Sequence, residues 1–224
     1  MGKQEAIAFV TALGGISIPQ EIMGVLCPSF PLLGALHLPP TIALGAQNCS
    51  SFGSGPYTGE VSASLLQEMG CAYVIVGHSE RRTLLGETSL MVKEKACQVL
   101  DHGMTPILCI GEPLDIYDQG RTDVYLKEQL EESLPDRDFI LAYEPVWSIG
   151  TGHTPRLEEI EAVHKFLHNV LKEKGFAHTP ILYGGSVTGK NAREILVLPS
   201  VSGVLVGGAS VSFDMFLTII ESAT

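Results

Sequence analysis

The sequence predicts an α/β fold with a parallel sheet, because short apolar runs alternate with longer segments of helical character along its 224 residues. These runs are apolar almost throughout, which is typical of parallel strands covered by helices on both faces. Seven strand cores are predicted, at 22–27, 41–48, 72–77, 105–110, 138–144, 179–184 and 202–207.

The segments between the strands are predicted to be helices. They lie at 60–69, 87–102, 121–133, 157–174, 189–197 and 212–221, with a weaker Pro-rich candidate at 29–36. One more helix opens the chain, because five apolar residues recur at helical spacing: Ala6, Ile7, Phe9, Val10 and Leu13. It is the one predicted helix with no strand in front of it.

An open doubly wound sheet and a closed (β/α)8 barrel both satisfy this alternation. Two observations favour the barrel: the units are evenly spaced, and polar or glycine residues follow nearly every strand, where barrels place their active sites. No G-x-G-x-x-G follows a strand, which argues against a dinucleotide-binding fold. We therefore predict a single barrel domain over 1–224 with seven recognisable strands, its first strand missing.

The composition excludes several classes of partner. Fourteen basic and twenty-five acidic residues give a net charge of -11, which argues against nucleic acid or an anionic membrane surface. No apolar run approaches the roughly 20 residues of a membrane-spanning helix. The five cysteines lack paired spacing and are predicted to be reduced thiols of a cytoplasmic protein. No metal-ligand spacing is present, so a metal site is not expected.

Two strand ends carry candidate catalytic side chains. His78 follows strand 72–77 in the segment GHSERR, where a helix N-terminus would disfavour a positive charge and leave a neutral imidazole to polarise a carbonyl. Glu144 ends strand 138–144, and apolar residues around it suit a base that removes a proton next to a carbonyl. The following segment, 145–152, has the composition of a lid. A structural histidine and a surface carboxylate are the alternative interpretations.

Paired glycines follow the last two strands, in YGGSV at 183–187 and VGGAS at 206–210. Adjacent glycines let the backbone approach a ligand and direct N–H groups at an anion. In barrels these last two loops commonly form a phosphate site, so phosphate binding is predicted here.

Together these segments resemble one family. YVIVGHSERR, AYEPVWSIGTG, YGGSV and GVLVGGAS are similar to the signature segments of triosephosphate isomerases and stand in the same order. AQNCSSFGSGPYTGEVSA is similar to the family's third loop, and ILCIGE to its fifth strand. The resemblance covers essentially the whole chain and implies a TIM barrel, a phosphorylated triose as substrate and no cofactor.

The resemblance also implies roles for individual residues. Glu144 matches the base, His78 the neutral electrophile that stabilises an enediolate, and Glu80 a carboxylate that pairs with a catalytic lysine. The phosphate cradle would consist of Gly150, Ser186, Gly207 and Gly208. Loop 46–60 matches the segment that inserts into a second subunit, so a homodimer is expected.

One feature departs from the family. Its members begin with a strand that ends in Asn-x-Lys, whereas GKQEAIAFVTAL reads as the opening of the first helix. The strand and its lysine would precede this helix, so we expect an incompletely closed barrel and impaired isomerase activity. A catalytically inactive phosphate-binding or structural homologue is the alternative, and a shortened form of a longer natural chain is a third possibility.

Overall fold

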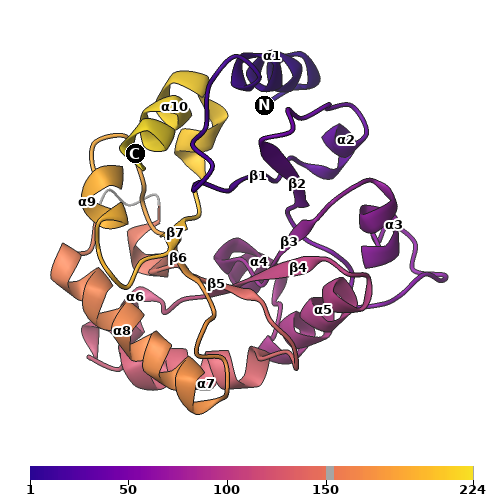
Figure 1. Cartoon of the computed structure of the whole chain (residues 1–224). Helices are drawn as coiled ribbons and strands as arrows, with labels where there is room; N and C mark the ends of the chain where they lie inside the picture. The colour runs from indigo at the N-terminus through magenta and orange to yellow at the C-terminus, as the bar shows by residue number, and fades with distance from the viewer. Residues whose placement is uncertain (150–153, 224) are drawn as a thin grey trace.

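The computed structural model describes residues 1–149 and 154–223. In these residues seven parallel strands form one sheet, and each strand pairs with its neighbours in chain order. The strands are β1 (Gly24–Leu26), β2 (Ile42–Ala46), β3 (Tyr73–Val76), β4 (Thr105–Ile110), β5 (Ile140–Tyr143), β6 (Ile181–Tyr183) and β7 (Gly203–Val204). The sheet curls round an axis inside a ring of helices, as in a TIM barrel (Figure 1). The seven predicted strands and the α/β barrel class are confirmed.

The curled sheet is open on one side. Among the described residues β1 pairs with β2 and β7 with β6, and β1 and β7 do not pair with each other. The two outermost strands are short, with three residues in β1 and two in β7. An incompletely closed barrel was expected, and the strand pairing of the described part of the chain agrees with it.

Helices surround the sheet, except that α4 lies within their ring (Figure 1). They are α1 (Lys3–Leu13), α2 (Phe30–Leu33), α3 (Ala63–Glu68), α4 (Ser79–Leu85), α5 (Ser89–Asp101), α6 (Leu114–Asp118), α7 (Thr122–Ser133), α8 (Leu157–Glu173), α9 (Ala192–Leu196) and α10 (Phe213–Ser222), with 3-10 turns η1 (Val146–Ser148) and η2 (Gly208–Val211). Every predicted helix is present, with small shifts at its ends. The sequence did not predict α6, η1 or η2. No helix in the described ranges is long and apolar enough to cross a membrane.

The strands are apolar throughout because both faces of the sheet are buried. Side chains alternate between the faces. Ile75, Ile107 and Ala142 pack inside the curl, while Val74 and Leu108 belong to the larger core between sheet and helices. This packing holds the carboxyl ends of β3 to β5, which carry the candidate site, in register.

The first and last helices pack against each other. The ring of Phe9 in α1 lies 6.0 Å from that of Phe213 and 5.9 Å from that of Phe216, both in α10. Leu13 and Leu26 belong to the same cluster, which connects the helix pair with β1. Figure 1 shows α1 beside α10 on the side of the molecule where β1 and β7 are unpaired. The helical layer therefore continues where the strand pairing stops.

Candidate active site

The turn after β3 positions His78. Gly77 has a φ of 70°, and a Cβ at this position would lie 2.9 Å or less from the side chains of Val92 and Arg82. Both the backbone conformation and the packing therefore require glycine. His78 follows as the N-cap of α4, at the carboxyl end of the strand. The predicted location of this histidine is confirmed.

The His78 ring is held at both nitrogens. Its Nδ1 accepts a hydrogen bond from the backbone N–H of Glu80 at 3.3 Å, while Nε2 lies 2.9 Å from Oε1 of Glu144. An accepting Nδ1 in a neutral ring leaves the proton on Nε2, so we assign that tautomer. Nε2–H therefore donates to the Glu144 carboxylate.

Glu144 lies directly after β5 and its side chain is 1% exposed. The backbone N–H of Ser79 donates to its Oε2 at 2.9 Å. The structure thus brings the predicted base and the predicted electrophile into direct contact, although they are 66 positions apart in the sequence (144 − 78 = 66).

The pKa of His78 moves in the direction opposite to the one expected. Burial lowers this pKa, but the hydrogen bond to Glu144 and the negative charges of Glu144 and Glu80 outweigh burial, so the net shift is upward. The prediction considered the helix N-terminus alone and could not include Glu144. When that carboxylate leaves Nε2, burial remains and favours the neutral ring.

Two glycines make room for Glu144. A Cβ on Gly184 would lie 2.9 Å from the Cγ of Glu144, and a Cβ on Gly111 would lie 1.7 Å from its carbonyl oxygen. The sequence interpretation assigned the YGG glycines to phosphate alone. The structure shows that Gly184 also lets the loop after β6 pack directly on the glutamate.

The family model for triosephosphate isomerase matches residues 2–223. The chain belongs to the triosephosphate isomerase family. It is 48% identical over 209 residues to the triosephosphate isomerase of Halorhodospira halophila, with 88% of this chain and 84% of that protein covered. It is 42% identical over 232 residues to that of Thermus thermophilus, covering 98% and 93%. With the protein of Hahella chejuensis the identity is 41% over 233 residues, covering 98% and 90%.

The other predicted site residues that the structure describes follow β3, β6 and β7, at the carboxyl ends of these strands. Glu80 is on the rim, with its side chain 72% exposed and Oε2 3.9 Å from Nδ1 of His78. Ser186 is half-buried, and its carbonyl accepts a hydrogen bond from Nδ2 of Asn191 at 2.9 Å. Gly207 and Gly208 are exposed at the start of η2, with no atom within 4 Å of a Cβ built on either. Gly150 lies outside the described residues.

A buried carboxyl group that the sequence interpretation missed lies beside the segment after Glu144. Oε1 of Glu112 accepts hydrogen bonds from the Tyr143 hydroxyl at 3.1 Å and the Trp147 indole N–H at 2.8 Å. Its Oε2 is buried with no hydrogen-bond partner among the described residues. Burial raises the pKa of Glu112, although these donors act in the other direction. Glu112 lies in the ILCIGE segment, but its burial depends on strand neighbours that are distant in sequence.

Arg82 is a second residue that the sequence interpretation did not single out. Its guanidinium donates to the carbonyls of Gly77 at 2.8 Å and Cys109 at 3.1 Å, and to the Ser133 hydroxyl at 3.3 Å. Burial lowers the pKa of this guanidinium. Arg82 also lines a cavity of about 160 Å³ that borders Glu144. It therefore links the turn that carries His78 to β4 and α7.

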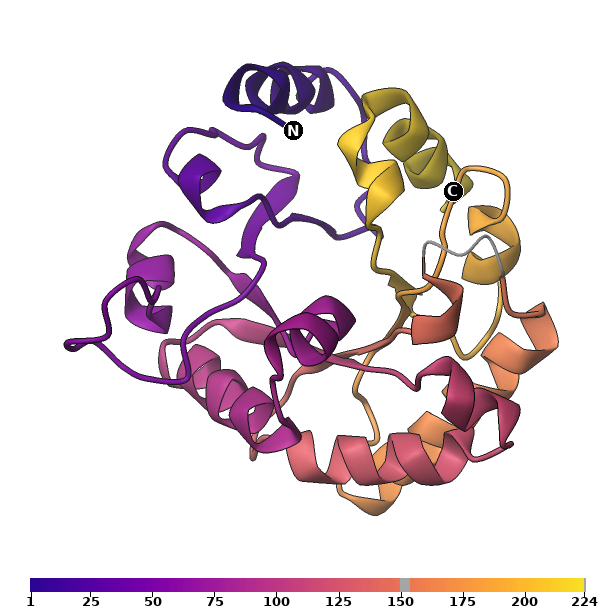
Figure 2. The same ribbon diagram turned by 180° about the vertical axis from the view of Figure 1, so that it is seen from behind.

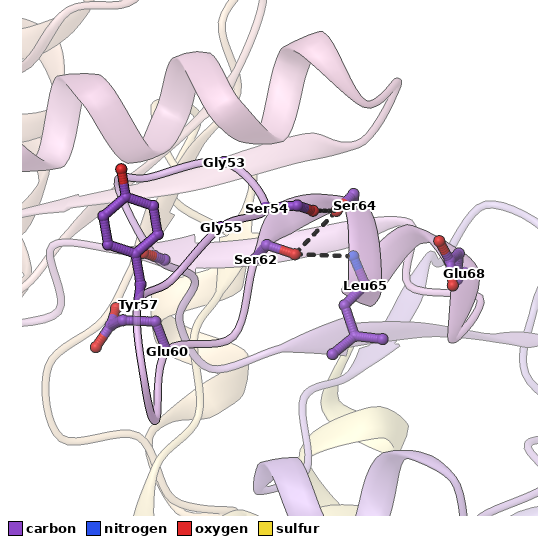
Figure 3. A pocket seen from close by; sticks show the side chains of 10 residues that line it. Gly53, Ser54, Gly55, Tyr57, Glu60, Ser62, Ser64, Leu65 and Glu68 are labelled. Carbon is purple, nitrogen blue, oxygen red and sulfur yellow. Dashed lines mark hydrogen bonds between the residues drawn. The ribbon is translucent and has the colours of Figure 1, made fainter.

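A larger cavity, of about 300 Å³, lies away from His78 and Glu144, under loop 46–60. Figure 3 shows the hydroxyls of Ser54, Ser62 and Ser64 directed toward one another there, at 2.9–3.0 Å between neighbouring oxygens. At the base of the loop, Asn48 accepts a hydrogen bond from the buried Lys95, which also pairs with Glu87. The loop is thus tied to α5, the helix after α4.

No group of three or more His, Cys, Asp or Glu side chains in the described ranges could hold a metal ion. The five cysteines are free, and three of them (Cys49, Cys71 and Cys109) are buried. Burial raises the pKa of Cys49 to about 12, so this thiol stays protonated at neutral pH.

Proposed function

We propose that this chain interconverts glyceraldehyde 3-phosphate and dihydroxyacetone phosphate. The observation that carries the proposal is the contact of 2.9 Å between Nε2 of His78 and the buried carboxylate of Glu144 at the carboxyl ends of β3 and β5. Family membership supports the choice of substrate, because the relatives are triosephosphate isomerases.

The geometry suits a proton shuttle. Glu144 would remove a proton from the carbon next to the carbonyl, while Nε2–H of His78 donates to the carbonyl oxygen as it gains negative charge. The hydroxyl proton on the carbon that lost its proton then passes, by way of Nε2 of His78, to the former carbonyl oxygen. Glu144 returns its proton to the former carbonyl carbon, which completes the interconversion. The hydrogen bond from Glu80 N–H to Nδ1 would keep the proton on Nε2, where it can donate to the reacting oxygen once Glu144 has withdrawn. Gly150, Ser186, Gly207 and Gly208 are the proposed phosphate ligands.

We propose that this activity is impaired. Among the described residues, neither Glu144 nor Glu80 has an ion pair with a lysine or arginine; both have His78 as their partner. A cation in this position would stabilise the negative charge of the transition state. Loss of one such preorganised group typically lowers the rate by about 10²–10³-fold. The same observation favours the second candidate function, an inactive homologue that binds phosphate.

The test is isomerisation of glyceraldehyde 3-phosphate by protein purified from a host whose own isomerase gene is deleted. Wild type is compared with Glu144→Ala and with Glu173→Ala, an exposed glutamate at the end of α8. Turnover that Glu144→Ala abolishes and Glu173→Ala retains supports the isomerase. Equal background rates in all three proteins would refute it and favour the inactive homologue.

We further propose a homodimer formed through loop 46–60. Phe52 and Tyr57 stack at a centroid distance of 4.4 Å while remaining 51% and 41% exposed, so an apolar surface faces outward from this loop. Sedimentation of wild type should give twice the chain mass, and Phe52→Ser should shift it toward the monomer. Val124→Ser, at an exposed position on α7, is the control. A monomeric wild type would contradict the proposal.

A cytoplasmic location is proposed from the free thiols, which persist in a reducing compartment. Cell fractionation tests it, and recovery of the protein outside the cytoplasmic fraction would count against it.

A further inference from the structure

The side chain of Tyr117 contacts both η1, which follows Glu144, and the first turn of α8. Its ring, in α6, stacks on the indole of Trp147 in η1, with centroids 4.1 Å apart and planes 28° apart. Its hydroxyl donates to Oε1 of Glu159 in the first turn of α8 at 3.2 Å. One half-buried side chain thus joins η1 to the start of α8. In Figure 2, η1 is the short helical turn just before the grey trace, and α6 lies next to it.

Both ends of this bridge are held by other bonds. Glu159 accepts from the backbone N–H of Arg156 at 2.7 Å and from its guanidinium at 3.0 Å, which fixes the start of α8. On the other side, Glu112 accepts from the Trp147 indole, and its carbonyl accepts from the backbone N–H of Val146 at 3.1 Å. Tyr117 therefore stacks on an indole whose N–H is already bonded to Glu112.

The 3-10 turn η1, which these bonds hold, begins at Val146, shortly after Glu144. In the present arrangement the Glu144 carboxylate occupies Nε2 of His78 and the Ser79 amide. A substrate carbonyl needs the same Nε2–H, so Glu144 must withdraw before His78 can act. Trp147 is three residues further along the chain. The contacts of its indole with Tyr117 and Glu112 therefore oppose a rearrangement of the backbone that carries Glu144.

We propose that Tyr117 is a positioning residue for Glu144: by stacking on Trp147 and bonding Glu159, Tyr117 stabilises the arrangement of η1 in which the Glu144 carboxylate contacts His78. The kinetic part of this inference rests on the proposed isomerase function. Loss of the stack should favour the arrangement that accepts substrate. An aromatic pair of this kind corresponds to about a 2- to 10-fold change in an equilibrium constant.

The test uses Tyr117→Ala, Tyr117→Phe and the control Leu114→Ala, at an exposed position of the same helix. Trp147 is the only tryptophan, so fluorescence reports its environment alone. In ligand-free protein, Tyr117→Ala should shift the emission to longer wavelength and increase quenching by acrylamide. Tyr117→Phe keeps the stack but loses the bond to Glu159, so it should fall between wild type and Tyr117→Ala, whereas Leu114→Ala should match wild type.

For turnover of glyceraldehyde 3-phosphate, Tyr117→Ala should lower KM by about 2- to 10-fold without raising kcat. The dissociation constant for glycerol 3-phosphate, followed by the same emission, should fall in parallel. An unchanged emission, quenching and dissociation constant in Tyr117→Ala would overturn the inference, as would a higher KM. If wild type shows no turnover, the proposed function fails, while emission and quenching still test Tyr117.

Discussion

Replacing Gly184 by alanine should displace the side chain of Glu144. Gly184 is not among the glycines with positive φ, and the nearest backbone atom to the new Cβ, the carbonyl oxygen of Tyr143, would be 3.3 Å away. The new Cβ would stand 2.9 Å from the Cγ of Glu144, whereas carbon atoms pack at about 3.5–4.0 Å. The glutamate must therefore move by about 0.6–1.1 Å, the difference between these distances.

A misplacement of about 1 Å can cost about 100-fold in rate, or about 2.7 kcal/mol of transition-state stabilisation. We expect Gly184→Ala to lower kcat to this extent and to change KM less, because the proposed base moves while the proposed phosphate ligands stay. The assay is steady-state isomerisation of glyceraldehyde 3-phosphate, with circular dichroism and thermal unfolding to confirm folding.

Gly14→Ala is the matched control. Gly14 has a helical φ of -66°, and a Cβ there would be 3.4 Å from the nearest atom outside its chain neighbours, the carbonyl oxygen of Thr11. This variant should keep wild-type kinetics. A folded Gly184→Ala protein with kcat within twofold of wild type would refute the steric argument. If wild type lacks activity, the His78 pKa by NMR gives a second reading, since a displaced Glu144 should raise this pKa less.

Three further changes have expected outcomes. Burial lowers the pKa of His164 from 6.5 to about 4, so the folded state resists protonation of this ring. The free energy of unfolding that is present above pH 6.5 should therefore fall by about 2 kcal/mol at pH 5. Urea unfolding at pH 7.5 and 5.0 checks this, and an equal loss in His164→Gln would contradict it. Glu144→Gln should lower the pKa of His78, because burial then prevails over the remaining charges; an NMR titration with an unchanged pKa would rule this out. Lys95→Met removes one of the two cations that contact the buried Glu87 and leaves Arg81. It should destabilise by about 1.5–3 kcal/mol in urea, more than the exposed Lys93→Met; similar losses in both variants would argue against a buried ion pair.

The sequence was most informative about elements that depend on local pattern. The strand predicted at 105–110 coincides with β4, because six apolar or β-branched residues end at the Gly111 turn. The predicted strand at 202–207 is longer than the two residues of β7, which has a pairing partner on one side among the described residues. Strand length there depends on a neighbour, which a local pattern does not specify.

The candidate site was predictable as a set of positions and not as a set of contacts. His78 and Glu144 could both be assigned to strand ends, yet their contact and its effect on the His78 pKa depend on the curl of the sheet. Glu112 and Tyr117 gave no local signal. Their roles depend on Trp147, which the fold brings to them from the loop after β5.

The packing of α1 on α10 has a consequence for the order in which the molecule opens. This contact joins the two ends of the described chain, so forming it carries the largest loop-closure entropy, and β1 and β7 gain no hydrogen bonds from each other. Local unfolding should start at this seam. In native-state hydrogen exchange, the amides of β1, β7 and the two terminal helices should exchange before those of β3, β4 and β5, which have a partner on each side. The proposed catalytic residues His78 and Glu144 therefore follow the strands that should remain folded longest.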